Sequence, residues 1–268
     1  MEPKLAGQYP ALRVLEPRPA WAVEGLSLHL SPQEGASQVS EALPGEELEL
    51  LEELPGGWNW VRTLHDSYLG YARSEGLSRQ RPGWSLSVTA LRGHVFAGPR
   101  IQAVVLGRLS YGAVLHLLTP DPEQHGDYLW WRVACRGGEG FVRTCVTAPP
   151  EHGPGSEGFM LAFLGVPYLW GGRSVWGLDC SGRAQLASGR PLPRDADQQQ
   201  RFLTPVDAPV PGDLAFFPGH VGIMLDERRM LHANATHMAV TVETLGEGGY
   251  GQRLARTLTG YGRLTAEL

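Results

Sequence analysis

Cysteines and long apolar runs are scarce in this sequence, and their scarcity excludes several classes of protein. The three cysteines, Cys135, Cys145 and Cys180, are too few for a disulfide framework, and no CxxC pair indicates a structural zinc site. No stretch of about 20 apolar residues occurs, and the N-terminus lacks a basic segment followed by an apolar one. We therefore expect a cytoplasmic protein, an expectation that a signal peptide removed from the chain would overturn.

Positive charge is also in short supply. The chain has 23 Lys and Arg residues against 28 Asp and Glu, which gives a formal net charge of −5. That balance argues against nucleic-acid binding. By contrast, 35 glycines and 21 prolines predict many turns and short elements rather than long helices. The length of 268 residues allows one to three domains.

Two segments of the first 150 residues share one pattern, which indicates an internal repeat with an offset of about 70 residues. Each contains a glycine before an apolar strand, a polar loop, a Trp-rich strand and a Gly-aromatic-x-Arg strand, GYAR at 70–73 and GFVR at 140–143. Short alternating strands with Gly-rich turns fit a small five-stranded barrel or sandwich. The arrangement resembles the bacterial SH3-like domain, and we expect most of its tryptophans to fill the two cores.

A Pro- and Gly-rich linker at 148–158 separates the repeat from a segment of different pattern. We expect helices over 157–164, 180–187 and 195–202, followed by strands over 213–217, 221–225 and 230–232. Helices followed by strands suggest an α+β domain. The predicted domains are 1–80 (N-terminal segment and first SH3-like domain), 81–150 (second SH3-like domain) and 151–268.

The residues with reactive side chains gather in the third domain. Cys180 follows three nearby glycines and is expected in the first turn of a helix, where the helix N-terminus favours the thiolate and lowers the cysteine pKa. His220 and His232 fall on two short strands, and antiparallel pairing of these strands would place the imidazoles side by side. A cysteine at a helix start is more often a small buried hydrophobe, so the prediction depends on the whole Cys, His, His set.

Five short motifs in this domain resemble those of the NlpC-type cysteine peptidases, in the family's order and over about 110 residues. The motifs are Tyr168-x-Trp170-Gly171-Gly172, Asp179-Cys180-Ser181-Gly182, Pro211-Gly212-Asp213-Leu214, His220-Val221-Gly222-Ile223 and Leu231-His232-Ala233. The resemblance implies thioester chemistry on bacterial cell-wall peptides, with no cofactor or metal. It also implies the fold class, an α+β papain-like catalytic domain preceded by two small all-β SH3-like barrels.

The resemblance further implies catalytic roles for the matched residues. Cys180 is the expected nucleophile, and His220 is the expected general base and acid. His232 is expected to orient His220. The hydroxyl of Tyr168 matches a group that helps the Cys180 backbone amide stabilise the oxyanion.

Binding of a free substrate amine is a second implication. In members with SH3-like domains, Asp179 and Ser181 match positions that bind the amine of an N-terminal L-Ala, and Tyr68 is the candidate for a first-domain tyrosine that closes the pocket. Asp179 would be left unpaired without the ammonium, which would penalise blocked substrates, although it could serve only as an N-cap. Arg194 is a candidate for binding the D-Glu carboxylate. Arg183 stands where the family more often has an apolar residue, and it could face solvent or line the cleft.

The whole architecture resembles the γ-D-glutamyl-L-diamino-acid endopeptidases. These cut between γ-D-Glu and the diamino acid in murein tripeptides or tetrapeptides with a free N-terminal L-Ala, in cell-wall peptide recycling. We expect a monomer that binds neither nucleic acid nor membranes. Two other functions stay open, namely a secreted hydrolase of intact peptidoglycan and a non-catalytic module that binds wall peptides. The intact Cys180, His220 and His232 argue against the binding module.

Overall fold

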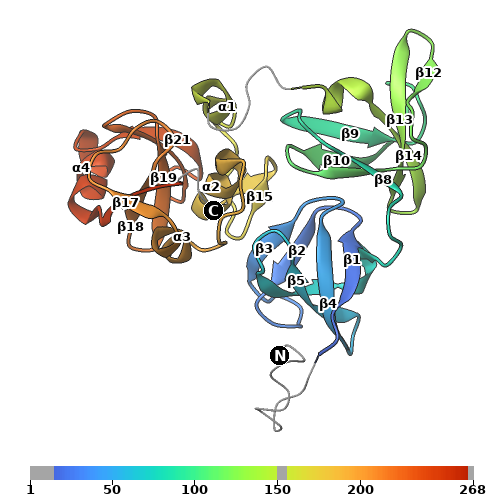
Figure 1. The fold of residues 1–268 in the computed structure, drawn as a ribbon, viewed down its shortest axis with the longest axis horizontal. Helices are drawn as coiled ribbons and strands as arrows, with labels where there is room; N and C mark the ends of the chain where they lie inside the picture. Colours follow the sequence, from blue (N-terminus) through green and yellow to red (C-terminus); the bar gives the residue numbers. More distant parts are fainter. Residues whose placement is uncertain (1–14, 150–155, 265–268) are drawn as a thin grey trace.

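A computed structural model describes residues 15–149 and 156–264 of the chain, which form two β units and one mixed unit (Figure 1). Within these two ranges, no helix combines the length and the apolar character needed to cross a bilayer.

The first unit is a seven-stranded antiparallel sheet with its own core. Its elements are β1 (Arg18–Ala22), β2 (Leu26–His29), β3 (Gln38–Ala42), β4 (Glu47–Leu54), β5 (Trp58–Thr63), β6 (Leu69–Arg73), the short 3-10 helix η2 (Ser74–Gly76) and β7 (Leu77–Ser78). Their order in the sheet is β3-β2-β6-β5-β4-β1-β7. Successive side chains of a strand point to opposite faces, and this alternation brings Leu48, Val61 and Ala72 together in the buried core.

The second unit repeats this arrangement. It contains β8 (Trp84–Ser87), β9 (Arg92–Phe96), β10 (Val105–Ser110), β11 (Val114–Leu117), β12 (Glu123–His125), β13 (Tyr128–Cys135), β14 (Gly138–Arg143) and the 3-10 helix η3 (Thr144–Thr147). The order β10-β9-β14-β13-β11-β8 matches β3-β2-β6-β5-β4-β1 strand for strand, and β12 is added beside β13. The predicted repeat of two all-β SH3-like units is confirmed, although each sheet has seven strands rather than the expected five, and Trp58 and Trp130 are buried as expected.

The third unit is the α+β unit. Its helices are α1 (Glu157–Leu161), α2 (Cys180–Ser188), α3 (Ala196–Phe202) and α4 (Gly248–Thr257), and its strands are β15 (Arg173–Ser174), β16 (Gly177–Leu178), β17 (Thr204–Val206), β18 (Leu214–Phe217), β19 (His220–Met224), β20 (Arg229–Asn234), β21 (Ala239–Thr244) and β22 (Gly260–Arg263). Six strands form one sheet in the order β17-β22-β18-β19-β20-β21. Helix α2 packs on β19 and β20. The predicted helices and strands occur close to their expected positions, whereas β15, β16, β17, β21, α4 and β22 were not predicted.

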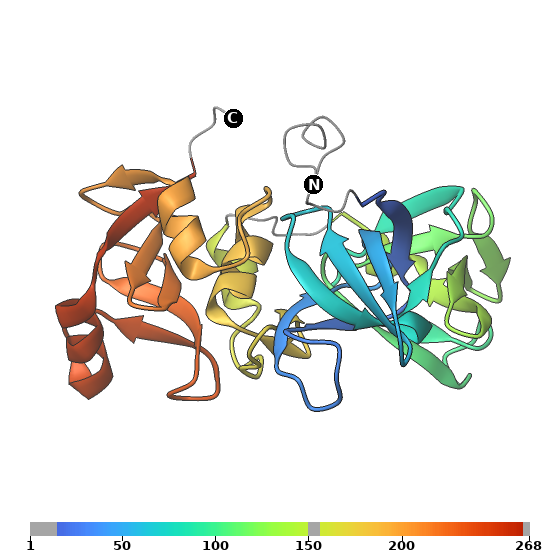
Figure 2. The same ribbon diagram turned by 90° about the horizontal axis from the view of Figure 1, so that it is seen from below.

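Both SH3-like units lie on the same side of the third unit (Figure 2), but they contact it in different ways. One continuous apolar core joins the second unit to the third. Within it, the Tyr111 ring of the second unit lies edge-on to Phe159 and Phe163, with centroid distances of 4.8 and 6.3 Å. The first unit contributes Leu43 to this shared core but keeps its main core separate, and its strand β3 lies against β15 with buried polar groups between them.

Candidate active site

Cys180 begins helix α2, and the local backbone explains this position. The Asp179 side chain accepts a hydrogen bond of 2.7 Å from the backbone N–H of Gly182 and so caps the helix. A Cβ at Gly182 would lie 2.4 Å from the carbonyl oxygen of Gly172, so only glycine fits there. The cap and this close approach fix Cys180 where α2 packs against β19.

Burial governs the ionisation of the Cys180 thiol. Burial, followed by the nearby Asp179 carboxylate, raises the pKa of Cys180 to about 11. The backbone N–H groups of Val221 and Ser181 oppose this shift without cancelling it. The expectation that the helix start by itself lowers this pKa is therefore wrong, because desolvation of the sulfur outweighs the helix N-terminus. Attack by Cys180 needs a base.

His220 and His232 lie side by side on adjacent antiparallel strands, as predicted. The register pairs Ile223 of β19 with Leu231 of β20, and Nε2 of His220 lies 2.7 Å from Nδ1 of His232. This contact leaves Nδ1 of His220 as the nitrogen available to a thiol. Burial lowers the pKa of His220 to about 4, so its imidazole is neutral near pH 7 and able to accept a proton.

His232 is enclosed by further side chains. Burial, then the charges of His220 and His237, lowers the pKa of His232 to about 3. Nδ2 of Asn234 lies 3.3 Å from its Nε2, and the Tyr250 ring stacks on it at 5.6 Å between centroids. Sequence reasoning missed both neighbours. Asn234 follows His232 by two residues and hence shares its strand face, but Tyr250 comes from the unpredicted helix α4.

Tyr168 lies close enough to Cys180 to respond to its charge. Burial, with added contributions from the charges of Cys180 and Asp179, raises the pKa of Tyr168 to about 12. The phenol therefore keeps its proton and can donate it in a hydrogen bond. The backbone N–H of Tyr168 donates to the carbonyl of Met238 at 2.9 Å, which fixes this segment beside the sheet. Its role in the oxyanion site stays a prediction.

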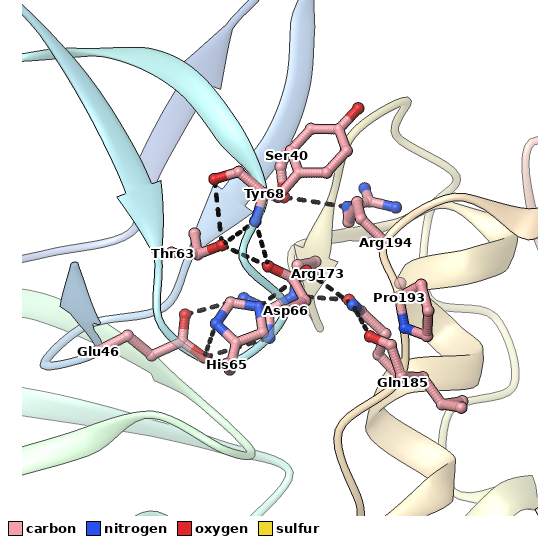
Figure 3. A network of polar contacts seen from close by, with 12 residues as sticks. Ser40, Glu46, Thr63, His65, Asp66, Tyr68, Arg173, Gln185, Pro193 and Arg194 are labelled. Carbon is pink, nitrogen blue, oxygen red and sulfur yellow. Dashed lines mark hydrogen bonds and ion pairs between the residues drawn. The ribbon is translucent and has the colours of Figure 1, made fainter. Parts of the chain in front are cut away.

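Asp179 and Ser181 form a buried polar cluster with Arg194. Arg194 is 1% exposed, and its two terminal nitrogens donate to the two Asp179 oxygens at 3.0 and 2.6 Å. One of these nitrogens also donates to the Ser181 hydroxyl at 2.8 Å, and Nε donates to the Ser40 hydroxyl of the first SH3-like unit at 3.0 Å (Figure 3). The expectation of an unpaired Asp179 carboxylate is therefore wrong. Arg194 is committed to this cluster rather than presented to a substrate carboxylate.

Arg183 neither faces solvent nor lines a cleft. Its side chain is completely buried, with one terminal nitrogen donating to the Met160 carbonyl at 3.0 Å and the guanidinium 4.2 Å from the Phe163 ring centre. Its other two nitrogens have no hydrogen-bond partner among the residues that the structure describes. Burial of this cation lowers the pKa of Arg183 to about 9.

Tyr68 extends from the first SH3-like unit toward the third. Its hydroxyl donates to Oδ1 of Asp195 at 3.4 Å, and burial raises the pKa of Tyr68 to about 12. Asp195 is the N-cap residue of α3, yet its side chain makes no capping hydrogen bond. Burial raises the pKa of Asp195. The sequence Pro193-Arg194-Asp195 before a polar helix was the only signal for this carboxylate.

Metal chemistry has no candidate site in the part of the chain that the structure describes, since no group of three or more His, Cys, Asp or Glu residues there could hold an ion. The residues brought together are instead a thiol, two imidazoles, a phenol and a paired carboxylate. This set is suited to nucleophilic catalysis with a general base.

Comparison with known proteins agrees with this geometry. A model of the NlpC/P60 family matches residues 165–259, and a model of the bacterial dipeptidyl-peptidase SH3 domain matches residues 28–77. Dipeptidyl-peptidase 6 of Lysinibacillus sphaericus is 31% identical over 264 residues, which cover 89% of this chain and 96% of that protein. The chain belongs to the NlpC/P60 family. It is a cysteine peptidase with an N-terminal SH3-like region.

Two further relatives of this NlpC/P60 peptidase extend the comparison. The γ-D-glutamyl-L-lysine dipeptidyl-peptidase of Bacillus subtilis (strain 168) is 34% identical over 163 residues, which cover 54% of this chain and 53% of that protein. The crystal structure of an NlpC/P60 family protein from Bacillus cereus superposes with a TM-score of 0.73 at 21% identity, covering 91% of this chain and 99% of that one. The fold of all three units is therefore one already found in the family.

Proposed function

We propose that this peptidase cleaves the bond between γ-D-Glu and the diamino acid in murein peptides that carry a free N-terminal L-Ala. The observation that carries the proposal is the contact of Tyr68 with Asp195, because it puts an aromatic side chain of the first SH3-like unit beside a carboxylate of the catalytic unit. The name of the Bacillus subtilis relative supports a γ-D-glutamyl substrate. A requirement for a free amine restricts the enzyme to stems already released from sugar, which suits cytoplasmic recycling.

The chemical steps use the neutral thiol and imidazole. The Cys180 proton passes to Nδ1 of His220 as the sulfur attacks the γ-carbonyl carbon of D-Glu. The Cys180 backbone N–H and the Tyr168 hydroxyl stabilise the oxyanion. Collapse returns the proton from His220 to the leaving amine of the diamino acid and forms a thioester. His220 then takes a proton from water, which attacks the thioester and releases L-Ala-D-Glu and the thiol.

Asp195, rather than Asp179, is the carboxylate with capacity for a substrate ammonium. The Asp179 oxygens accept from Arg194, from the Ser181 hydroxyl, and from the backbone N–H groups of Gly171 and Gly182. Among the described residues, the Asp195 side chain accepts only the long hydrogen bond from Tyr68. An ammonium beside a half-buried carboxylate forms a charge-assisted hydrogen bond. An acetylated amine loses that charge and adds bulk against the Tyr68 ring.

The test compares the free tripeptide L-Ala-γ-D-Glu-diamino acid with its N-acetylated form. We expect turnover of the free peptide, its loss in Cys180→Ala, and a kcat/KM at least about 100-fold lower for the acetylated peptide. Asp195→Asn should raise KM about tenfold, whereas Asp197→Asn, whose carboxylate forms an exposed ion pair with Arg201 on the same helix, should not. Equal rates on the two peptides would reject the amine pocket and favour a hydrolase of intact wall. No turnover of either peptide would favour a binding module.

A further inference from the structure

The turn between β5 and β6 of the first SH3-like unit is tied to the catalytic helix by one carboxylate. Asp66 lies in this turn, and its side chain is completely buried. Oδ1 accepts from the Thr63 hydroxyl and, at 3.2 Å, from the backbone N–H of Tyr68. Oδ2 accepts from Nε2 of Gln185 at 2.8 Å (Figure 3). One side chain thus holds both the residue that carries the amine-facing phenol and the helix that carries Cys180.

Gln185 is fully engaged on the other side of this contact. It lies on α2, five residues after the cysteine, and is 9% exposed. Its Nε2 also donates to the Leu192 carbonyl at 2.9 Å, and its Oε1 accepts from Nε of Arg173 at 2.9 Å. Arg173 in turn donates to both Glu46 oxygens, at 2.8 and 3.2 Å, in the first unit. Both polar atoms of the Gln185 amide are hydrogen-bonded, so these bonds fix the orientation of the side chain.

The turn itself needs this support. Ser67 adopts a left-handed backbone conformation, φ 58°, which is unfavourable for a residue other than glycine. Tyr68 follows directly, and its backbone N–H is held by Asp66 and by the Thr63 hydroxyl at 2.9 Å. A turn held in such a conformation relaxes when its hydrogen bonds are lost. The Tyr68 ring would then move away from the catalytic unit.

Asp66 is suited to this task because it stays ionised. Burial opposes its charge, but the hydrogen bond and charge of His65, the Thr63 hydroxyl and the Arg173 cation together keep the pKa of Asp66 well below its ordinary value. A carboxylate accepts donors on both oxygens, as this position requires. An amide has only one oxygen and would face either the turn or Gln185 with an N–H.

We propose that Asp66 and Gln185 are positioning residues that hold Tyr68 over the substrate amine and thereby set the selectivity for a free N-terminus. The inference rests on the proposed function. It goes further by assigning free-amine selectivity to a contact between the two units, made by residues that do not touch the substrate.

The main test is Asp66→Asn, assayed with the free and N-acetylated tripeptides. We expect KM for the free peptide to rise about tenfold with kcat within about twofold, and the preference for the free peptide to fall about tenfold. In the double variant Asp66→Asn with Gln185→Glu, the new amide donates to the new carboxylate, which still accepts from Arg173. The double variant should therefore recover part of the preference for the free peptide. Ser110→Ala removes a hydrogen bond between the second SH3-like unit and the catalytic unit and should leave KM and the preference unchanged.

A readout without substrate separates this inference from the proposed function. Amide hydrogen exchange across 63–70 should be faster in Asp66→Asn than in the wild type, while alkylation of Cys180 by iodoacetamide is unchanged. If Asp66→Asn does not fold, Thr63→Val tests the same turn, because it removes a donor to Asp66 and the acceptor for the Tyr68 N–H inside the first unit alone. A wild-type enzyme that does not prefer the free peptide overturns the proposed function. Wild-type preference retained in the variants, or exchange unchanged across 63–70, overturns the positioning role.

Discussion

The two SH3-like units share a strand order but contact the catalytic unit through different chemistry. The second unit shares a continuous apolar core with it, centred on contacts such as that of Tyr111 with Phe159. Apart from Leu43, the first unit keeps a separate core, and it contributes buried polar groups that pair with Arg173 and Arg194. Apolar contacts are non-directional, whereas hydrogen bonds to buried charges fix the relative orientation of the two units that they join. The second unit is therefore placed as a scaffold, and we propose that the first forms part of the site.

The two SH3-like units differ in one equivalent hairpin turn, which joins β5 to β6 in the first unit and β13 to β14 in the second. In the second unit, β13 and β14 pair Cys135 with Gly138 and are joined by two residues, with Gly137 at φ 86°. In the first unit, the corresponding strands are joined through 64–67, and the Thr63 N–H donates to the Tyr68 carbonyl at 3.0 Å across the turn. The two added residues make room for Asp66. A short insertion in one copy of a repeat was enough to reach the catalytic unit.

The largest predicted effect comes from breaking the charge pair that joins the first unit to the catalytic unit. Arg173→Met should lower the free energy of unfolding by about 3–5 kcal/mol, because it leaves Glu46 without its cation among buried groups. Glu41 would add to the loss, since burial already raises its pKa and Arg173 opposes that shift. Urea unfolding measures the change. Arg62→Met removes an ion pair on the exposed surface of the first unit. It should change the free energy of unfolding by less than about 1 kcal/mol. Similar losses in both variants would show that the interface pair is not special.

Converting the turn of the first unit to that of the second should lower activity strongly without unfolding the protein. Replacing 64–67 by Asn-Gly gives a two-residue hairpin suited to the twist of the strands. It removes Asp66 and releases Tyr68, so kcat/KM for the free tripeptide should fall about 100-fold. Arg136→Asn in the turn of the second unit is the matched control and should leave kcat/KM unchanged. A shortened turn with full activity would mean that the two copies do not differ in function.

The third prediction concerns Arg183 of α2, which borders the apolar core shared with the second unit. Arg183 lies against Phe163 of the shared apolar core, and two of its nitrogens have no hydrogen-bond partner in 15–149 and 156–264. Arg183→Met should raise the free energy of unfolding by about 1–3 kcal/mol, because an apolar side chain of similar length avoids burying the charge. Thermal unfolding measures the gain, and kcat/KM should stay the same. Arg183→Lys keeps the charge and should give no gain, and stabilisation by both variants would contradict this explanation.

Much of the fold could be predicted from the sequence because its signals are local. The offset of about 70 residues, with Gly-aromatic-x-Arg at the end of each copy, predicted two units that do have the same strand order. In the catalytic unit, apolar spacing and turn residues predicted helices α1, α2 and α3 and strands β18, β19 and β20. Helix α4 escaped because Gly248, Gly249 and Gly251 lie in its first turns, and glycine disfavours helix. Its stability comes from packing of residues such as Leu254 on the sheet.

The candidate site, like the fold, could be predicted from the sequence only in part. The motifs brought Cys180, His220 and His232 to attention, and strand pairing then predicted that the imidazoles lie side by side. The partner of Asp179 could not be derived, because one of the contacts that hold Arg194 comes from Ser40, 154 residues away. The contact of Asp66 with Gln185 spans 119 residues. Such pairs depend on how whole units pack, and no local pattern in the chain encodes them.

The smallest predicted effect comes from replacing one serine at the equivalent position of each SH3-like unit. Ser40 on β3 and Ser110 on β10 occupy matching strands, and each hydroxyl accepts a hydrogen bond from the catalytic unit, from Nε of Arg194 at 3.0 Å and from the N–H of Val175 at 3.1 Å. Replacing either serine by alanine should cost about 1 kcal/mol of stability in urea unfolding. Only Ser40→Ala should also raise KM for the free tripeptide, by about threefold, because Arg194 holds Asp179 beside the nucleophile. An equal change in KM for the two variants would remove the functional distinction between the units.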